Sequence, residues 1–295
     1  MEVGFIGTGT MGQPMAANIL AAGNSLKVHD KNRNAASPLV EAGALWCGDI
    51  TTAVNGCETV LLSLPGPKEV ELVAKEALRT MHSGQTLVDM STNSPALVRE
   101  LSKLANKKGV EFLDAPVSGG IRGARKGTLA IMVGGDKKSF NKLGNLWECM
   151  GSNVFHVGDV GAGNAAKLVN NMLAFSIMMS NAEALVLGAK AGIDPQVLWD
   201  IVRSSSGNSM TWEGGARAIL RDRLAPTFTV DLACKDIGLA TGMAEELGIE
   251  LEMIKKAEEL LKGFQQNGFA KEDVLATVKS MESSAGVKLR GTWRE

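Results

Sequence analysis

The chain changes its pattern once along its length, and this change is what most restricts how it can fold. Up to about residue 160, short apolar runs such as Val3–Ile6, Thr59–Leu64 and Thr86–Met90 alternate with stretches whose apolar residues recur at helical spacing. Strands that alternate with helices form parallel βαβ units, and right-handed crossovers wind such units into an open sheet. Ligands of this kind of sheet bind at the carboxyl ends of its strands.

After Gly163 the strand signals end and the remaining patterns are helical. The first helix is expected over Asn164–Ala191, and its run Leu168–Met179 is apolar on nearly every face. A membrane span is the alternative, but asparagines and a glutamate keep the apolar run below the ~18 residues that a span needs. We therefore expect a helix buried between two domains or two subunits, with one domain over 1–162 and a second over 163–295. Further helices are expected over Val197–Ser204, Glu213–Leu220, Leu232–Leu247, Ile249–Asn267 and Lys271–Ser284.

Composition removes several classes of function. The chain has 31 basic and 32 acidic residues, a formal net charge of -1, which argues against nucleic acid as a partner. It has no tyrosine, so oxidoreductases that use a Tyr/Lys pair are excluded. Its four cysteines form no C-x-x-C pair and no zinc-like cluster with histidine, so no metal site is expected. Scattered thiols, and a folded motif that begins by Val3 with no room for a targeting peptide, favour a cytoplasmic protein without a membrane anchor.

The segment Gly7-Thr8-Gly9-Thr10-Met11-Gly12 follows a predicted strand and opens a predicted helix. In that context Gly7 permits a tight turn, Gly9 lets the backbone approach a pyrophosphate, and Gly12 lets helix and strand pack closely. The helix N-terminus offers N–H groups and the positive end of its dipole to the phosphates. A glycine-rich turn without a ligand is the alternative, but position, order and flanking patterns all favour a dinucleotide site.

Asp30 stands at the end of the second predicted strand. Its carboxylate can accept both ribose hydroxyls of an adenosine half and would repel a 2′-phosphate, which favours NAD over NADP. Arg33 could soften this preference by receiving a 2′-phosphate, although a surface ion pair is the simpler interpretation. NADP therefore stays possible.

Two further segments could carry chemistry. Asp114–Gly120 follows a short strand and presents Ser118 and two consecutive glycines, whose N–H groups can hold a carboxylate, with a plain turn as the alternative. Lys167 and Asn171 lie four residues apart and share one face of the long helix. Apolar neighbours predict burial, which would lower the pKa of Lys167 from ~10.4 toward the range of an acid/base group. A lysine that snorkels at a helix start is the alternative.

The histidines, which are common proton carriers, give no competing candidate. His29, His82 and His156 have no carboxylate beside them in an obvious dyad, and the sequence holds no nucleophile elbow and no Walker loop. Elimination leaves Lys167 as the strongest acid/base candidate, and Asn171 could position either the lysine or a substrate hydroxyl.

Together these segments resemble the β-hydroxyacid dehydrogenase family. The resemblance covers essentially the whole chain and is carried by Gly4–Ala16, Asp114–Gly120 and Gly161–Asn171, in order and with family spacing. It implies an α/β fold with an N-terminal Rossmann dinucleotide-binding domain, a long interdomain helix and an all-helical C-terminal domain. It also implies an NAD(P)-dependent oxidoreductase that transfers a hydride to or from a small 3-hydroxy acid or semialdehyde, in the manner of 3-hydroxyisobutyrate dehydrogenases.

Alternatives are a tartronate semialdehyde, succinic semialdehyde or glyoxylate reductase of the same family, or a regulatory protein that binds the nucleotide without catalysis.

The resemblance also implies roles for single residues. Lys167 becomes the catalytic lysine, with Asn171 beside it. Substrate binding is implied for Ser118, Gly119, Gly120, Phe228 and Asp236, and cofactor binding for Gly7, Thr8, Gly9, Thr10, Met11, Gly12, Asp30, Leu64, Pro65, Thr92 and Lys235. The chain departs from the family pattern at Asn93, where an aliphatic residue is frequent. The all-round apolar helix and the small second domain imply a homodimer or homotetramer.

Overall fold

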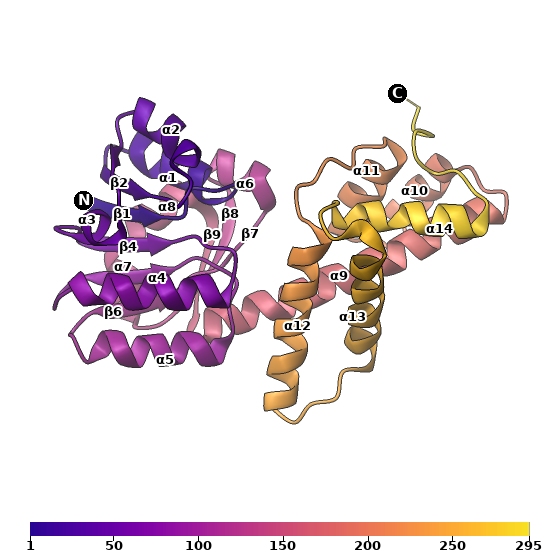
Figure 1. Ribbon diagram of the computed structural model, residues 1–295. Coiled ribbons are helices and arrows are strands. Elements are labelled where there is room, and N and C mark those ends of the chain that lie inside the picture. The colour runs from indigo at the N-terminus through magenta and orange to yellow at the C-terminus, as the bar shows by residue number, and fades with distance from the viewer. Residues whose placement is uncertain (295) are drawn as a thin grey trace. The chain divides into compact units, whose positions relative to one another are not determined.

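The computed structural model describes residues 1–294 and divides into two compact units (Figure 1). Unit 1 is Met1–Leu168, and unit 2 is the chain from Val169 onward. The dividing point lies inside one long helix, α9 (Ala162–Lys190), slightly beyond the expected boundary at 162/163. The first turns of α9 therefore belong to unit 1, and the rest of the helix belongs to unit 2.

Unit 1 is built on one nine-stranded sheet formed within residues 1–168. The strands follow the order β3-β2-β1-β4-β5-β6-β8-β7, and β9 also pairs with β8. Pairing is parallel from β3 through to β6, as the alternating sequence pattern predicts. The strands are β1 (Glu2–Ile6), β2 (Ser25–His29), β3 (Leu45–Trp46), β4 (Thr59–Leu62), β5 (Thr86–Asp89), β6 (Glu111–Asp114), β7 (Val117–Ser118), β8 (Leu129–Gly134) and β9 (Gly151–Gly158).

The far part of the sheet departs from the expected all-parallel arrangement. Strand β8 runs antiparallel to β6 and β7, and only β9 pairs with it in parallel. Gly119 and Gly120 turn the chain at the end of β7, and the short helix α6 (Gly120–Lys126) leads straight into β8. A chain that leaves one strand and enters its neighbour at the same end of a sheet makes an antiparallel pair.

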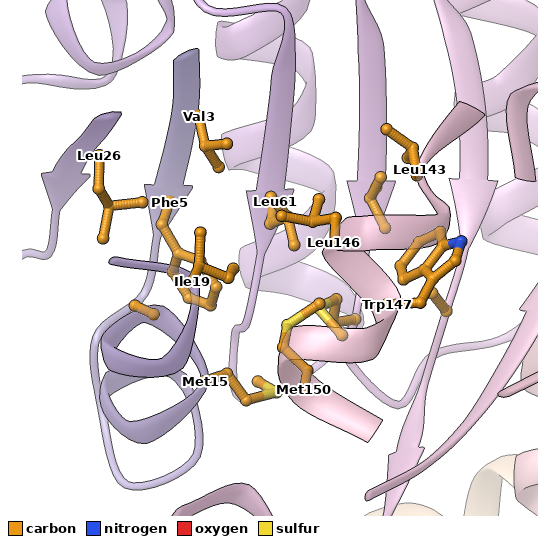
Figure 2. Close-up of a cluster of buried hydrophobic side chains, with 14 of the residues drawn as sticks. Val3, Phe5, Met15, Ile19, Leu26, Leu61, Leu143, Leu146, Trp147 and Met150 are labelled. Atoms are coloured by element: carbon orange, nitrogen blue, oxygen red, sulfur yellow. The ribbon is translucent and has the colours of Figure 1, made fainter. Parts of the chain in front are cut away.

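Helices cover both faces of this sheet and bury alternate side chains of each strand in two cores. Val3, Phe5 and Leu61 lie in the core shared with α1 and α8 (Figure 2), whereas Ile6 and Leu62 lie in the core shared with α3, α4 and α5. Because both faces are covered there, the central strands β4 and β5 are buried along their whole length, whereas β2 alternates buried Leu26 and Val28 with the more exposed Lys27. The other helices of unit 1 are α1 (Gly12–Ala21), α2 (Arg33–Glu41), α3 (Ile50–Val54), α4 (Pro67–Thr80), α5 (Pro95–Asn106), α7 (Lys137–Lys142) and α8 (Gly144–Met150).

Helices dominate unit 2, as the second half of the sequence predicts. One core surrounds Phe175 of α9, and another surrounds Trp199 and Trp212. By length and mean hydropathy α9 could cross a membrane, yet within unit 2 it also carries buried asparagines. The elements after α9 are α10 (Pro195–Arg203), a π-helix (Trp212–Ala216), α11 (Arg217–Leu220), α12 (Val230–Glu246), α13 (Glu252–Phe264), a second π-helix (Gln265–Phe269), a 3₁₀ turn (Val274–Thr277) and α14 (Val278–Ala285).

Two of the expected helices have irregular ends. The helix expected over Ile249–Asn267 finishes in the second π-helix, where Gly268 takes a φ of 92°. The helix expected over Lys271–Ser284 starts later, as the 3₁₀ turn, because the Asp273 side chain accepts the Leu275 N–H and sets the first turn there.

Candidate functional site

Glycine shapes the loop between β1 and α1. A Cβ on Gly12 would lie 1.9 Å from the carbonyl oxygen of Gly7, so no side chain fits where the turn meets the helix. A Cβ on Gly9 would meet nothing within 4 Å, because this residue faces open space. Helix α1 begins without a side-chain cap and without an acidic residue in its first turn. Its first N–H groups and its positive dipole end therefore remain available to an anion.

A groove of about 490 Å³ runs along this loop. The glycine loop and the start of α1 form one wall, and residues from α2 and α6 complete it. Arg125 is the charged side chain among the residues that line it, so the groove favours an anionic ligand. The lining residues are Thr8, Gly9, Thr10, Gln13, Pro14, Asn34, Ala35, Pro38, Ile121 and Arg125.

Asp30, just after β2, reaches back to the glycine loop. One carboxylate oxygen accepts the N–H of Thr8 and the other accepts the N–H of Asn32, both at 2.8 Å. The residue is partly exposed, so both oxygens retain lone pairs for further donors such as hydroxyl groups. The guanidinium of Arg33 lies over the ring of Trp46, 5.8 Å from its centroid, a contact that the sequence did not indicate.

Ser91 joins two of the segments that are expected to contact the cofactor. Its Oγ accepts the N–H of Leu64 at 2.9 Å, so the Leu64-Pro65 turn after β4 is tied to the turn after β5 that carries Thr92. The N–H of Ser91 in turn donates to Asp89 Oδ1 at 3.0 Å. Since β4 and β5 are parallel neighbours, both turns emerge at the same edge of the sheet.

Asp114 is buried and caps the long helix. Its Oδ1 accepts the N–H of Gly161, and its Oδ2 accepts the N–H of Asn164, both at 2.7 Å. Burial raises the pKa of the Asp114 carboxyl, and these hydrogen bonds oppose that rise. The cap fixes the first turn of α9 at the carboxyl edge of the sheet, directly after β6.

Lys167 lies one turn further along α9 and is only 8% exposed. Asn171, one more turn along the same helix, is 6% exposed. Lys167 and Asn171 are therefore buried as expected, although Val169 between them is 44% exposed, and a lysine that snorkels into solvent does not fit. A buried lysine needs partners or a task, because an ammonium group is costly to desolvate.

Ser118 ends β7, where it pairs with Ala130 of β8. The next two residues, Gly119 and Gly120, have φ values of 129° and 62°, which glycine adopts without a steric penalty. Successive N–H groups in such a turn point into one concavity that can bind a carboxylate. A Cβ on Gly120 would meet nothing within 4 Å, so space for a ligand is open beside it.

In unit 2, Asp236 of α12 holds two other candidate residues. Its Oδ2 accepts the Nδ2 of Asn171 at 2.7 Å, and its Oδ1 lies 2.7 Å from the Nζ of Lys235. Asp236 itself is only 2% exposed. This buried carboxylate therefore holds Asn171 and Lys235 together.

Phe228 stacks on Phe175 of α9, with ring centroids 5.6 Å apart. Buried Asp273 holds the backbone of this segment, since its Oδ2 accepts the N–H groups of Thr227 at 2.8 Å and Phe228 at 3.2 Å. The Thr227 hydroxyl donates to the same oxygen at 2.8 Å. The conformation that presents Phe228 thus depends on one carboxylate.

The structure thus gathers the candidate residues in two groups. In unit 1 the glycine loop, Asp30 and the turns after β4 and β5 share the carboxyl edge of the sheet with the start of α9. In unit 2 Asp236 brings Asn171 and Lys235 together. The candidates in unit 1 are Gly7–Gly12, Asp30, Leu64, Pro65, Thr92, Ser118–Gly120 and Lys167, and those in unit 2 are Asn171, Phe228, Lys235 and Asp236.

Other reactive side chains are occupied in structural contacts. A ring nitrogen of each histidine lies within 2.8–3.3 Å of a main-chain carbonyl oxygen. Burial raises the pKa of all four thiols, and that of Cys57 to about 11, which disfavours the nucleophilic thiolate. Within residues 1–294, no three His, Cys, Asp or Glu side chains gather as a metal site would require.

Sequence reasoning overlooked the residues that support the site. Ser91, Asn164 and Asp273 each hold a segment that carries a candidate residue. Asp273 could have been found as an N-cap, because it directly precedes a helical pattern. Ser91 and Asn164 act across long sequence separations, and no local pattern indicates such contacts.

A glycine-lined turn from strand to helix and an acidic residue after the second strand are typical of a domain that binds a dinucleotide. Residues 2–158 match the family model described as the NAD binding domain of 6-phosphogluconate dehydrogenase. Residues 161–281 match the model described as the NAD-binding part of NADP-dependent 3-hydroxyisobutyrate dehydrogenase. The chain belongs to the β-hydroxyacid dehydrogenase family and is an NAD(P)-dependent hydroxyacid dehydrogenase.

Individual relatives agree with this assignment. The chain is 37% identical to 2-(hydroxymethyl)glutarate dehydrogenase of Eubacterium barkeri, over 99% of this chain and 98% of that protein. It is 41% identical to 3-hydroxyisobutyrate dehydrogenase of Pseudomonas aeruginosa, over 83% and 85% of the two chains. The solved structure of Mycobacterium tuberculosis 3-hydroxyisobutyrate dehydrogenase with L-serine has a TM-score of 0.88 at 31% identity, over 95% of this chain and 99% of that one. The expected fold class and family are confirmed.

Proposed function

We propose that Lys167 is the acid/base of a dehydrogenase that acts on a small 3-hydroxy acid or the matching semialdehyde. The observation that carries the proposal is the burial of this lysine on a helix turn that Asp114 fixes at the ligand-binding edge of the sheet. In oxidation the neutral amine of Lys167 takes the proton of the substrate hydroxyl. In reduction its ammonium form stabilises the developing alkoxide and returns the proton.

The substrate carboxylate is held by the Ser118 hydroxyl and the N–H groups of Gly119 and Gly120. Asn171 orients the reacting oxygen, and Phe228 supplies an apolar wall. Asp236, expected to bind substrate, would do so by way of Asn171, whose Nδ2 donates to its buried carboxylate.

The residues of unit 1 fit a nicotinamide dinucleotide. Gly9 leaves open space for a pyrophosphate at the uncapped start of α1, and the oxygens of Asp30 have lone pairs left for a ribose. The Leu64-Pro65 turn and Thr92 border the nicotinamide half, and Lys235 would contact the cofactor. When bound, the nicotinamide supplies the hydride acceptor in oxidation and the hydride donor in reduction.

For the nucleotide, Asp30 favours NAD, because a 2′-phosphate placed beside its carboxylate would meet like charge. We expect kcat/KM to be at least about tenfold higher with NAD than with NADP. Asp30→Asn removes the charge but keeps an acceptor for the Thr8 N–H, so it should narrow this ratio. A wild-type preference for NADP would contradict the assignment.

Replacement of the lysine tests the acid/base role. Lys167→Ala should lower kcat by about 100-fold or more, because the proton then has no carrier, while the dissociation constant for nucleotide stays within a few-fold of wild type. The assay follows reduced nicotinamide absorbance with a panel of 3-hydroxy acids and semialdehydes that includes 3-hydroxyisobutyrate, 2-(hydroxymethyl)glutarate and tartronate semialdehyde. Near-normal turnover of the variant would refute the role, and no turnover by wild type on any compound of the panel would instead refute the proposed substrate class.

Helix α9 also carries exposed apolar side chains. Within unit 2, Leu173 and Leu187 of α9 are 51% and 72% exposed and lie on the same side of the helix as Ser176 and Ser180. We propose that this stripe is buried in a homodimer or homotetramer, and that the enzyme works in the cytoplasm.

A further inference from the structure

Four polar side chains buried in unit 1 form one chain of hydrogen bonds. Asn93 Nδ2 donates to Asp89 Oδ2 at 3.2 Å, and the Asn93 N–H donates to Asn164 Oδ1 at 2.6 Å. Asn164 Nδ2 then donates to Asp114 Oδ2 at 3.2 Å. Asp89, Asn93, Asn164 and Asp114 are each fully buried. This series of hydrogen bonds therefore runs through the interior from the end of β5 to the cap of α9.

Asn164 is the junction of this chain. The main-chain N–H of Asn93 can only donate, so the Asn164 Oδ1 must face it. The Nδ2 is then left for Asp114, which also accepts the Asn164 N–H, and the amide has a single satisfied orientation. Loss of this side chain would leave a buried N–H without a partner, which the fold tolerates poorly.

The junction connects two segments with different tasks. On one side is the turn of Ser91, Thr92 and Asn93, which is expected to border the nicotinamide. On the other side is the first turn of α9, and Lys167 follows Asn164 by one turn of that helix. The hydrogen bond from the Asn93 N–H to the Asn164 side chain joins these two segments directly. Because the Asn164 amide has only one satisfied orientation, this side chain sets the distance between them.

We propose that Asn164 is a positioning residue for hydride and proton transfer, because it fixes Lys167 relative to the Thr92 turn. The inference rests on the proposed function of Lys167. Misplacement of reacting groups by about 1 Å can cost about 100-fold in rate, so a residue of this kind can matter without touching the substrate.

The experiment compares Asn164→Ala with Asn164→Ser and with Asn181→Ala. The serine hydroxyl can serve either Asn93 or Asp114 but not both, so it should give a smaller effect in the same direction. Asn181 is a matched control, because it is also a buried asparagine of α9 and has a hydrogen bond of its own, to Thr211.

Two measurements separate positioning from a general loss of structure. In single turnovers with NADH and the preferred semialdehyde, Asn164→Ala should lower the rate constant of the absorbance change by about 10- to 100-fold at an unchanged amplitude. A partly unfolded enzyme would instead lose amplitude at an unchanged rate constant. In nucleotide-free protein, amide hydrogen exchange should accelerate together in residues 91–94 and 162–167. Asn181→Ala should change neither the rate constant nor exchange in these segments.

Wild-type rate constants and exchange in both Asn164 variants would overturn the inference. If Asn164→Ala does not fold, the serine variant decides the matter by the same two measurements. Failure of the inference differs from failure of the proposed function, because in the first case Lys167→Ala still lowers the kcat of an active wild-type enzyme by about 100-fold or more.

Discussion

Asp89 shows how a single residue can link the site to the stability of the protein. It ends β5 and is fully buried, and burial raises its pKa from 3.8 to about 6. Hydrogen bonds from Ser91 and Asn93 work against this rise, and the nearby charge of Asp114 adds to it. The residues of β5 and β6 are paired so that Asp89 and Asp114 are direct partners, which explains their mutual repulsion.

The raised pKa predicts how stability depends on pH. Between pH 3.8 and about 6 the unfolded chain has lost the Asp89 proton while the native protein keeps it. The contribution of Asp89 to the free energy of unfolding therefore falls as pH rises through this range, and it is constant at higher pH. The total fall is about 3 kcal/mol. Asp89→Asn cannot titrate, so the difference in unfolding free energy between wild type and variant, measured by urea unfolding from pH 4 to pH 7, should show most of this fall. A flat difference would mean that Asp89 titrates normally.

Helix α9 is the element on which the proposed assembly depends. Leu173→Glu places a charge on its exposed stripe, where a second copy would have to desolvate it. We expect the variant to shift toward monomer in sedimentation velocity at micromolar concentration while wild type stays associated. Leu72→Glu is the control, because Leu72 of α4 is 63% exposed but lies outside the stripe. Monomeric wild-type protein would refute the proposal.

Elements with a strong local signal were predictable, and those defined by tertiary contacts were not. The apolar run Val3–Ile6 and the helical pattern from Asn164 appear as β1 and α9 with ends shifted by one or two residues. Strand β7 has only two residues and exists because β8 pairs with it. The first π-helix replaces the start of the regular helix expected from Glu213. It begins at Trp212, whose indole Nε1 donates to the Trp199 carbonyl at 3.1 Å.

The same limit applies to the site. The glycine loop and the burial of Lys167 could both be predicted, because each depends on residues that are close together in the sequence. The bond from Asn164 to Asp114 joins residues 50 positions apart, and that from Ser91 to Leu64 joins residues 27 positions apart. Such contacts depend on which strands become neighbours, and a single sequence does not record that order.

At the scale of the whole molecule, residues 286–294 fold back over unit 2 after α14, and we call this segment the strap. Buried Glu282 accepts the N–H groups of Leu289 at 2.7 Å and Arg290 at 2.9 Å. The N–H of Trp293 donates to the Leu220 carbonyl at 3.1 Å, and its ring packs edge-on against Trp199 at a centroid distance of 5.0 Å. This strap covers the core that contains Trp199, and sequence reasoning assigned it no role.

Removal of the contact between Trp293 and Trp199 should lower the stability of unit 2. Trp293→Ala loses a partly buried aromatic pair, so we expect the free energy of unfolding to fall by about 1–3 kcal/mol. Arg294→Ala is the control, because its ion pair with Asp194 is solvent-exposed and should matter by about 0.5 kcal/mol or less. Urea unfolding followed by far-ultraviolet circular dichroism measures both, and equal effects would show that the tryptophan does not anchor the strap.

The placement of the indole rings has an optical consequence. The chain has five tryptophans and no tyrosine, so its intrinsic fluorescence arises from indole alone. Trp46 stacks with His29 at the end of β2, beside the carboxylate that would receive a ribose, while three others cluster in unit 2. Emission from Trp46 would therefore respond to nucleotide arrival, and emission from the cluster to the integrity of the second unit. Without added labels, the change in total indole emission could therefore be followed both on nucleotide addition and on unfolding.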